Sequence, residues 1–398
     1  MLCLYNTGDG SLCCAYDSFG RSDTVKVGSR TLSDYLYDSK GRVDTFTYGN
    51  GTTVKYGYDH LNRQTSTTIN NVLRYNKLYD GLSRLLAVED ILLGRKVRYE
   101  YDILDRAVGE LLINTATNKV YADLKIRYDD TKNRVAGYDV NIEGISKATD
   151  FVYGGNGLDP DIISSVKHNN TTKLSYAYDS LNRLKTRTIS TSTPFVTEYG
   201  FLNGNGTMRT TTLVKTVKNG NDTLQYAYDK LGNITSITKN NNLVESYTYD
   251  NLNQLKTVTN GTDTWEYTYD NGGNILSVKK NGVVEKSYTY GDTEWKDLLT
   301  NYNGTNITYD AIGNPLSYRG GMSFTWADGR KLATVTKGTD SISYTYNSDG
   351  LRNSKTVNGV TTEYYWLNGM LQGQKTGRNT GDGSLCCIPP NGKKLQVQ

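Results

Sequence analysis

Larger apolar side chains alternate with smaller or polar ones along short stretches of this chain. Leu224, Tyr226 and Tyr228, for example, stand at every second position. A period of two puts these side chains on one face of a β-strand, whereas a helix would scatter them around its surface. After a polar break, the segment 234–239 resumes the pattern. This stretch therefore predicts two strands joined by a turn.

The polar break belongs to a unit that recurs along the chain, Tyr-x-Tyr-Asp-x-x-Gly/Asn-Arg/Asn-Leu/Ile/Val. Its aspartates at positions 17, 38, 59 and 80 follow one another at intervals of 21 residues. An Asp side chain can accept a hydrogen bond from the backbone N–H two residues further on, and Gly or Asn tolerates the positive φ that closes such a turn. We therefore predict a structural role in the turns for the aspartates of the clearest copies, Asp38, Asp59, Asp80, Asp179, Asp229, Asp250, Asp270 and Asp310.

A second kind of turn lies between these units. Asn-Gly is the strongest short-range signal of a β-hairpin, and it stands between Thr- and Val-rich flanks at Asn219-Gly220, Asn260-Gly261, Asn281-Gly282, Asn303-Gly304 and Asn358-Gly359. Two turns in each repeat leave two strands of about five to seven residues, and successive hairpins can pair edge to edge. The pattern thus predicts an all-β fold of tandem antiparallel β-hairpin repeats that form one long sheet.

The repeats divide the chain into an atypical N-terminal segment (1–14), a repeat array (15–378) and an irregular C-terminal tail (379–398). Two stretches, 107–127 and 138–170, break the rhythm. We interpret both as long loops or imperfect repeats, the first of them an enlarged hairpin. The nine residues Asn6–Cys14 recur identically as Asn379–Cys387, which indicates a duplicated coding segment or an assembly boundary, and we assign no function to them.

The composition agrees with a β protein that is rich in turns and whose sheet is partly exposed to water. Of 398 residues, 36% are hydrophobic, and the chain holds 33 Tyr, 40 Gly and 5 Pro at a mean hydropathy of -0.59. Tyr suits a half-buried sheet because its ring packs while its hydroxyl reaches water or a polar partner.

Charge, hydropathy and cysteine content limit the partners, membrane segments and metal sites that the chain can have. The net charge of +4 is too small to indicate nucleic acid or an acidic membrane as partner. No apolar stretch is long enough to span a bilayer, and the first residues do not resemble a signal peptide. The five cysteines lie near the ends, so we expect no disulfides or thiolate metal sites in the repeats. Cysteine usage leaves the redox compartment open.

Copies such as Tyr37–Val43 and Tyr178–Leu184 resemble the YD repeat of Rhs proteins, bacterial wall-associated proteins, the C components of insecticidal toxin complexes and teneurins. The resemblance covers residues 15–378. It implies a sheet that spirals into a hollow shell, which often encloses a C-terminal toxin, and some members of the family are credited with carbohydrate binding. The family's Asp-Pro-x-Gly-Leu core motif is expected after Thr361–Gly369 but does not occur there, and Asp159-Pro160 does not match it. The chain is therefore interpreted as a shell segment without its closing core and toxin.

The sequence offers little for catalysis. Its two histidines, His60 and His168, stand near no candidate nucleophile, and general acid–base chemistry usually needs a positioned His. A uniform row of turn aspartates provides neither the six to eight oxygens that Ca²⁺ takes nor one paired carboxylate site for glycoside hydrolysis. We expect no enzyme activity, no metal and no cofactor.

Aromatic side chains beside Asn, Asp and Arg often hold sugar rings, although cross-strand packing needs the same residues. Possible glycan contacts are Trp265, Tyr267, Tyr365 and Trp366. The leading hypothesis is a structural segment of a secreted or cell-surface Rhs-like protein, whose partner is the C-terminal toxin or effector domain of the intact polyprotein. The alternative is a carbohydrate- or surface-binding adhesion module with cell-surface glycans as partner.

Overall fold

The computed structural model describes residues 2–7, 10–155, 159–203, 210–377 and 384–387. Within these ranges the chain forms 36 β-strands and one short 3-10 helix, η1 (Arg319–Gly321). Strands β1–β28 belong to a 28-stranded sheet and β29–β36 to an 8-stranded sheet. The prediction of an all-β fold built from antiparallel hairpins is confirmed. No helix in the described part of the chain is long and apolar enough to cross a membrane.

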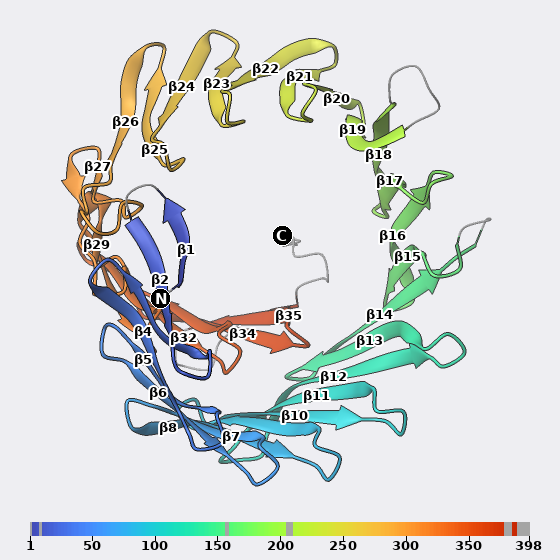
Figure 1. The fold of residues 1–398 in the computed structure, drawn as a ribbon. Coiled ribbons are helices and arrows are strands. Elements are labelled where there is room, and N and C mark those ends of the chain that lie inside the picture. Colours follow the sequence, from blue (N-terminus) through green and yellow to red (C-terminus); the bar gives the residue numbers. More distant parts are fainter. Residues whose placement is uncertain (1, 8–9, 156–158, 204–209, 378–383, 388–398) are drawn as a thin grey trace. The chain divides into compact units, whose positions relative to one another are not determined.

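Strands follow one another along the whole described chain (Figure 1). The first twelve are β1 (Leu2–Thr7), β2 (Gly10–Tyr16), β3 (Ser22–Val27), β4 (Arg30–Tyr37), β5 (Val43–Tyr48), β6 (Thr53–Tyr58), β7 (Gln64–Ile69), β8 (Val72–Tyr79), β9 (Leu85–Asp90), β10 (Arg95–Tyr101), β11 (Ala107–Asn114) and β12 (Val120–Asp129). The next fourteen are β13 (Arg134–Ile142), β14 (Ile145–Tyr153), β15 (Ile163–His168), β16 (Thr171–Tyr178), β17 (Leu184–Ile189), β18 (Phe195–Asn203), β19 (Thr210–Asn219), β20 (Asp222–Tyr228), β21 (Ile234–Lys239), β22 (Asn242–Tyr249), β23 (Leu255–Asn260), β24 (Asp263–Tyr269), β25 (Ile275–Lys280) and β26 (Val283–Thr289). The last ten are β27 (Asn301–Tyr302), β28 (Thr305–Asn306), β29 (Ser317–Tyr318), β30 (Met322–Ala327), β31 (Lys331–Lys337), β32 (Asp340–Tyr346), β33 (Arg352–Val357), β34 (Val360–Leu367), β35 (Met370–Gly377) and β36 (Ser384–Cys387).

A repeat consists of a Tyr-bearing strand, an Asp turn and a return strand. Strand β22 pairs antiparallel with β23, with Tyr247 opposite Val258, and the register shifts between Thr248 and Tyr249. Such a β-bulge bends and twists the strand locally. The same shift occurs immediately before the Tyr of other repeats, at Tyr37, Tyr58, Tyr79, Tyr178, Tyr228, Tyr269 and Tyr346.

The hairpin turns follow two patterns. Asn281-Gly282, Asn303-Gly304 and Asn358-Gly359 have positive φ at both residues, as a type I′ turn requires. At the other two predicted turns the Asn is the last residue of its strand, and Gly220 or Gly261 alone takes a positive φ at the start of the turn. The sequence analysis overlooked an Asn-Asn version with positive φ at both residues, found at Asn70-Asn71, Asn169-Asn170 and Asn240-Asn241.

The two irregular stretches are enlarged hairpins. Strands β11, β12, β13 and β14 are 8 to 10 residues long and run through most of 107–127 and the first half of 138–170. Of the two alternatives, imperfect repeats describe 107–127 and 138–153, where these strands lie. The strands extend because Leu124 and Ile142, at most 1% exposed, supply buried apolar side chains.

At the N-terminal end, β1 pairs with β2, and β2 pairs with β3. At the C-terminal end, β36 pairs with β35. The other residues of the predicted tail, 379–383 and 388–398, lie outside the described residues. The division into 1–14, 15–378 and 379–398 remains a proposal.

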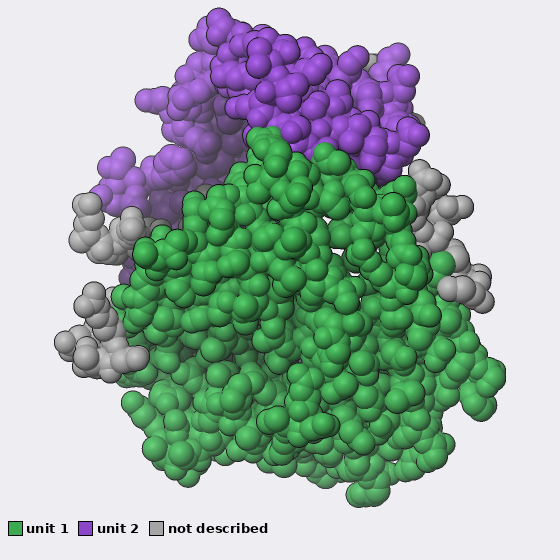
Figure 2. All heavy atoms as spheres, turned by 90° about the vertical axis from the view of Figure 1, so that its left-hand side faces the viewer, with its two compact units in different colours: residues 1–126, 140–146, 289–398 green, residues 127–139, 147–288 purple. Residues whose placement is uncertain are grey.

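The chain divides into two compact units, coloured separately in Figure 2: unit 1 comprises residues 1–126, 140–146 and 289–398, and unit 2 comprises 127–139 and 147–288. Unit 1 contains most of the core, with buried hydrophobic side chains from both its N-terminal and its C-terminal strands, among them Val54, Val88, Leu112, Ile312 and Tyr365. Among the described residues of unit 2, the buried hydrophobic side chains are Val166 and Val278. Most tyrosines of unit 2 are therefore only partly covered.

Candidate functional site: the turn ladder and the seam of unit 1

The Asp turn is closed by its own side chains. In the Asp38 turn, Oδ1 accepts the N–H of Lys40 at 2.9 Å and of Arg42 at 3.0 Å, and Oδ2 accepts Nε of Arg42 at 2.7 Å. Gly41, with φ 80°, donates its N–H to the Asp38 carbonyl at 2.9 Å. The Arg42 side chain, together with backbone N–H bonds that outweigh desolvation, lowers the pKa of Asp38.

The eight aspartates named from the sequence share this geometry. Each accepts the backbone N–H groups two and four residues further on: Asp38, Asp59, Asp80, Asp179, Asp229, Asp250, Asp270 and Asp310. In the turns of Asp229, Asp270 and Asp310 an Asn takes the place of Arg, as in the 2.9 Å bond from Asn233 Nδ2 to Asp229 Oδ2. The Asp250 turn has Gln254 at this position. Asp17, Asp102 and Asn347 accept the same two backbone bonds.

The tyrosine before each Asp joins one repeat to the next. Tyr249 donates its hydroxyl to the Ile234 carbonyl at 2.8 Å. The same bond, to a carbonyl near the start of the strand after the preceding turn, is made by Tyr37, Tyr58, Tyr79, Tyr101, Tyr153, Tyr178, Tyr269 and Tyr346. Tyr228 donates to the Val214 carbonyl within β19. Trp326 and Trp366 stand in the Tyr position and donate Nε1–H to a carbonyl instead.

The turn arginine completes this link, because its guanidinium also lies over the tyrosine of the following repeat. Arg42 is 4.2 Å from the ring centroid of Tyr58, and Arg21 is 4.1 Å from that of Tyr37, within the range of a cation–π interaction. Asp and Tyr, with Arg in the repeats that carry it, thus form a ladder along the sheet, which we call the turn ladder.

The ladder leaves its carboxylates little freedom for other chemistry. Among the described residues, no group of three or more His, Cys, Asp or Glu side chains could hold a metal ion. His60 lies in an Asp turn and His168 ends β15.

The four aromatic residues named as glycan contacts lie in different environments. Trp265 and Tyr267 share one face of β24 and are partly exposed, and Lys280 Nζ lies 5.2 Å from the Trp265 ring centroid. Tyr365 is 0% exposed, so its prediction as a contact is wrong: neighbouring strands cover its ring. Trp366 is partly exposed and lines a pocket.

That pocket belongs to a second group of contacts, which the sequence did not predict. We call this group the seam. Here hairpin turns and strands of residues 28–126 and 140–143 meet residues 292–375 within unit 1. At one end, Ser29 donates its hydroxyl to Glu294 at 2.9 Å and Arg30 pairs with Asp292. Desolvation opposes ionisation of Asp292, but N–H donors and the Arg30 charge outweigh it, so the pKa of Asp292 is lowered.

Next along the seam, an Asp turn rests on a hairpin turn. Asn50 Nδ2 donates to Asp310 Oδ2 at 2.9 Å and to the Gly329 carbonyl at 3.1 Å. Ile312, 0% exposed, packs against Gly49: a Cβ there would lie 3.1 Å from Ile312 Cγ2. Gly49 has no room for a side chain, because that Cβ would also lie 1.8 Å from the Thr31 carbonyl oxygen.

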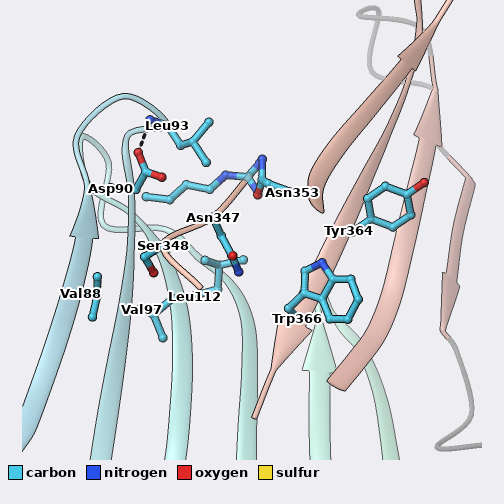
Figure 3. Close-up of a pocket in the computed structure, with 11 residues that line it drawn as sticks. Val88, Asp90, Leu93, Val97, Leu112, Asn347, Ser348, Asn353, Tyr364 and Trp366 are labelled. Carbon is cyan, nitrogen blue, oxygen red and sulfur yellow. Dashed lines mark hydrogen bonds between the residues drawn. The ribbon is translucent and has the colours of Figure 1, made fainter. Parts of the chain in front are cut away.

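The pocket lies further along the seam (Figure 3). Tyr364 and Trp366 face it from β34, and Asp90 lines it from the end of β9. Arg95 reaches across to Asn353 at 3.0 Å and Glu363 at 2.9 Å. Asp90 is 6% exposed, and burial raises its pKa.

At the far end of the seam, Glu143 accepts the Tyr365 hydroxyl at 2.8 Å and Lys375 Nζ at 2.7 Å. Desolvation would raise the pKa of Glu143, but these two donors lower it overall. Glu110 accepts the backbone N–H of Asn368 at 2.6 Å, and its burial raises its pKa. The seam is thus a series of hydrogen bonds and ion pairs between segments more than 200 residues apart in sequence.

The comparisons with known proteins fit this geometry. Residues 210–358 match the family model described as Teneurin YD-shell. A crystal structure of TcdB2-TccC3-TEV is similar over 93% of this chain and 22% of that chain, with a TM-score of 0.73 and 16% identity. A structure of TcdB2-TccC3 without its hypervariable C-terminal region is similar over 99% of this chain and 23% of that chain, with a TM-score of 0.71 and 14% identity. No curated protein sequence matches the chain significantly.

A Photorhabdus luminescens Tc holotoxin pore has the same fold over 92% of this chain and 23% of that chain, with a TM-score of 0.66 and 14% identity. The chain therefore has the fold of a YD-shell. The predicted resemblance to the Rhs/YD-repeat family is confirmed, because residues 210–358 match the YD-shell family model and the similar structures share the fold. The chain spans less than a quarter of the length of these similar structures.

Proposed function

We propose that this chain is a wall segment in the shell of a secreted or cell-surface Rhs-like protein, and that the intact protein encloses or presents a C-terminal effector domain. The observation that carries the proposal is the uneven burial of the sheet. Unit 1 covers its apolar face with its own strands, whereas the tyrosine face of unit 2 is left partly uncovered, with Val166 and Val278 as its buried hydrophobic side chains in the described part. A sheet face rich in half-exposed aromatic rings offers contact area to an enclosed chain.

Two further observations support a structural rather than a catalytic role. The turn carboxylates are engaged by their own repeats, as in the Asp38 turn. One similar structure is described as lacking a hypervariable C-terminal region, which fits a constant wall joined to a variable effector. The effector itself belongs to the proposal and is identified only as a C-terminal domain.

Limited proteolysis of the intact protein, encoded by the complete gene, tests this proposal. The C-terminal domain should survive a protease concentration that degrades the same domain expressed alone. Adding urea up to the unfolding transition of the wall should abolish that protection. Cleavage of the C-terminal domain at equal rates in the intact and isolated forms would refute enclosure.

Glycan binding at the pocket of the seam is the second candidate function. Tyr364 and Trp366 offer aromatic surface there, and Asp90, Arg95 and Asn353 offer polar groups, the two kinds of group that contact ligands in such sites. Binding on a glycan array should be lost in Trp366→Ala and kept in Trp265→Ala, which lies on β24 outside the pocket. Equal binding by both variants and the parent chain would exclude the pocket.

A further inference from the structure

Exposed apolar side chains stand at one position of the Asp turns, two residues after the Asp. In unit 1 they are Phe19, Leu61, Leu82 and Leu104, which are 80%, 53%, 75% and 62% exposed. Unit 2 repeats the pattern with Leu181, Leu231 and Leu252, which are 57%, 72% and 71% exposed. The turn itself does not need an apolar residue here, because Lys40 and Gly272 donate the same N–H to their Asp. We call these residues the turn tips.

At one Asp turn the residue in the turn-tip position is buried, and its surroundings show what kind of surface can cover a turn tip. Ile312, two residues after Asp310, is 0% exposed. Its partner is the hairpin turn between β5 and β6, where Gly49 leaves space for the Ile312 side chain and Asn50 donates to Asp310 Oδ2 at 2.9 Å. The chain therefore contains its own example of a turn tip docked on a hairpin turn that carries Asn.

The two surfaces also match in spacing. Asp turns and hairpin turns alternate along the chain, so each kind recurs once every two strands, or roughly 10 Å at about 4.8 Å per strand. One row of turn tips can therefore meet one row of hairpin turns at several positions in the same register. Unit 1 carries exposed hairpin turns at Asn303-Gly304 and Asn358-Gly359.

We propose that the exposed turn tips of unit 1 dock on the hairpin turns of a second copy of this chain. The contact is heterologous, because a turn-tip row on one copy meets a hairpin-turn row on the other, and such contacts can continue into open stacks. Burial of Leu61 and Leu82 would drive the association, as burial of Ile312 does within one chain. This inference goes beyond the proposed wall function and does not depend on an enclosed effector.

Sedimentation velocity over a range of protein concentrations tests the proposal. The parent chain should associate as its concentration rises, and the double variant Leu61→Glu, Leu82→Glu should associate at least tenfold more weakly. Lys40→Glu is the matched control, since it places the same carboxylate at the same turn position without removing an apolar side chain. A far-ultraviolet circular dichroism spectrum identical to that of the parent shows that the double variant keeps its fold.

Cysteine pairing identifies the partner surface. Leu82→Cys mixed with Asn358→Cys should form a disulfide-linked dimer faster than either variant alone, because the proposed contact joins unlike surfaces. A parent chain that stays monomeric at all concentrations would overturn the proposal. Association that is unchanged in the double variant would also overturn it, and would place the contact at the edge strands instead.

Discussion

Replacing Ile312 by Ala should destabilise the protein far more than the same truncation at an equivalent turn position. Ile312 is 0% exposed in the seam, whereas Leu252, two residues after Asp250, is 71% exposed. Truncation of a fully buried Ile or Leu to Ala costs about 2–5 kcal/mol. Substitutions at exposed positions usually stay within about 0.5 kcal/mol. Ile312→Ala should therefore lower the urea midpoint clearly, and Leu252→Ala should hardly change it.

Tryptophan fluorescence during urea unfolding is a suitable readout, because the Trp295 ring lies against Gly313, next to the substituted residue. A double-mutant cycle with Asn50→Ala then tests whether the hairpin turn is the partner. Residues in contact show coupling energies of about 0.5–3 kcal/mol, while independent sites add within about 0.5 kcal/mol. Equal midpoint shifts for Ile312→Ala and Leu252→Ala, or strict additivity with Asn50→Ala, would refute the seam contact.

Three further predictions concern the turn ladder and the hairpin turns. Tyr249→Phe removes the hydroxyl donated to the Ile234 carbonyl and should lower the free energy of unfolding by about 0.5–1.5 kcal/mol in urea titrations; a change near zero would show that the bond contributes nothing. Asn281→Ala should cost about 1–2 kcal/mol in the same assay because φ is positive there, whereas Asn260→Ala, at the end of a strand, should cost less; the reverse order would contradict the turn assignment. The pKa of Asp38 and of most other turn aspartates is lowered in the folded protein. Their stabilising contribution is therefore complete above the unfolded pKa of about 4 and is lost as pH falls through the lower folded values. An equal melting temperature at pH 2 and pH 6 would rule this out.

The strands and the Asp turns were predictable because their causes are local. Alternation in β20 identifies the strand, and the spacing from Asp229 to Gly232 and Asn233 identifies the turn that follows it. The exact hairpin type was not predictable from the Asn-Gly dipeptide. Asn281 lies inside its turn, but Asn219 ends a strand one residue before it. The register of the paired strands decides between the two cases.

The seam escaped prediction because its contacts are distant in sequence and have no periodic signature. Arg95 and Glu363 are 268 residues apart, and neither stands at a conspicuous position of its repeat. The burial of Tyr365 was also not predictable from the sequence. Its strand β34 ends in four consecutive apolar residues, 364–367, and the sequence does not say which sheet face another layer will cover. Burial at 0% follows from that covering layer and from its bond to Glu143.

Ladder and seam hold the molecule by different means, and the difference bears on its role. The ladder joins neighbours about 15 residues apart, so each added repeat brings its own Tyr–carbonyl bond and its own Asp turn. Stability of this kind is close to a sum over repeats and sets no limit on their number. Contacts such as Glu143 with Lys375 join distant strands, and their loss would leave each stretch of sheet intact while separating the layers of unit 1. The proposed wall function would need both properties, because the ladder allows extension and the seam holds one layer of strands against another.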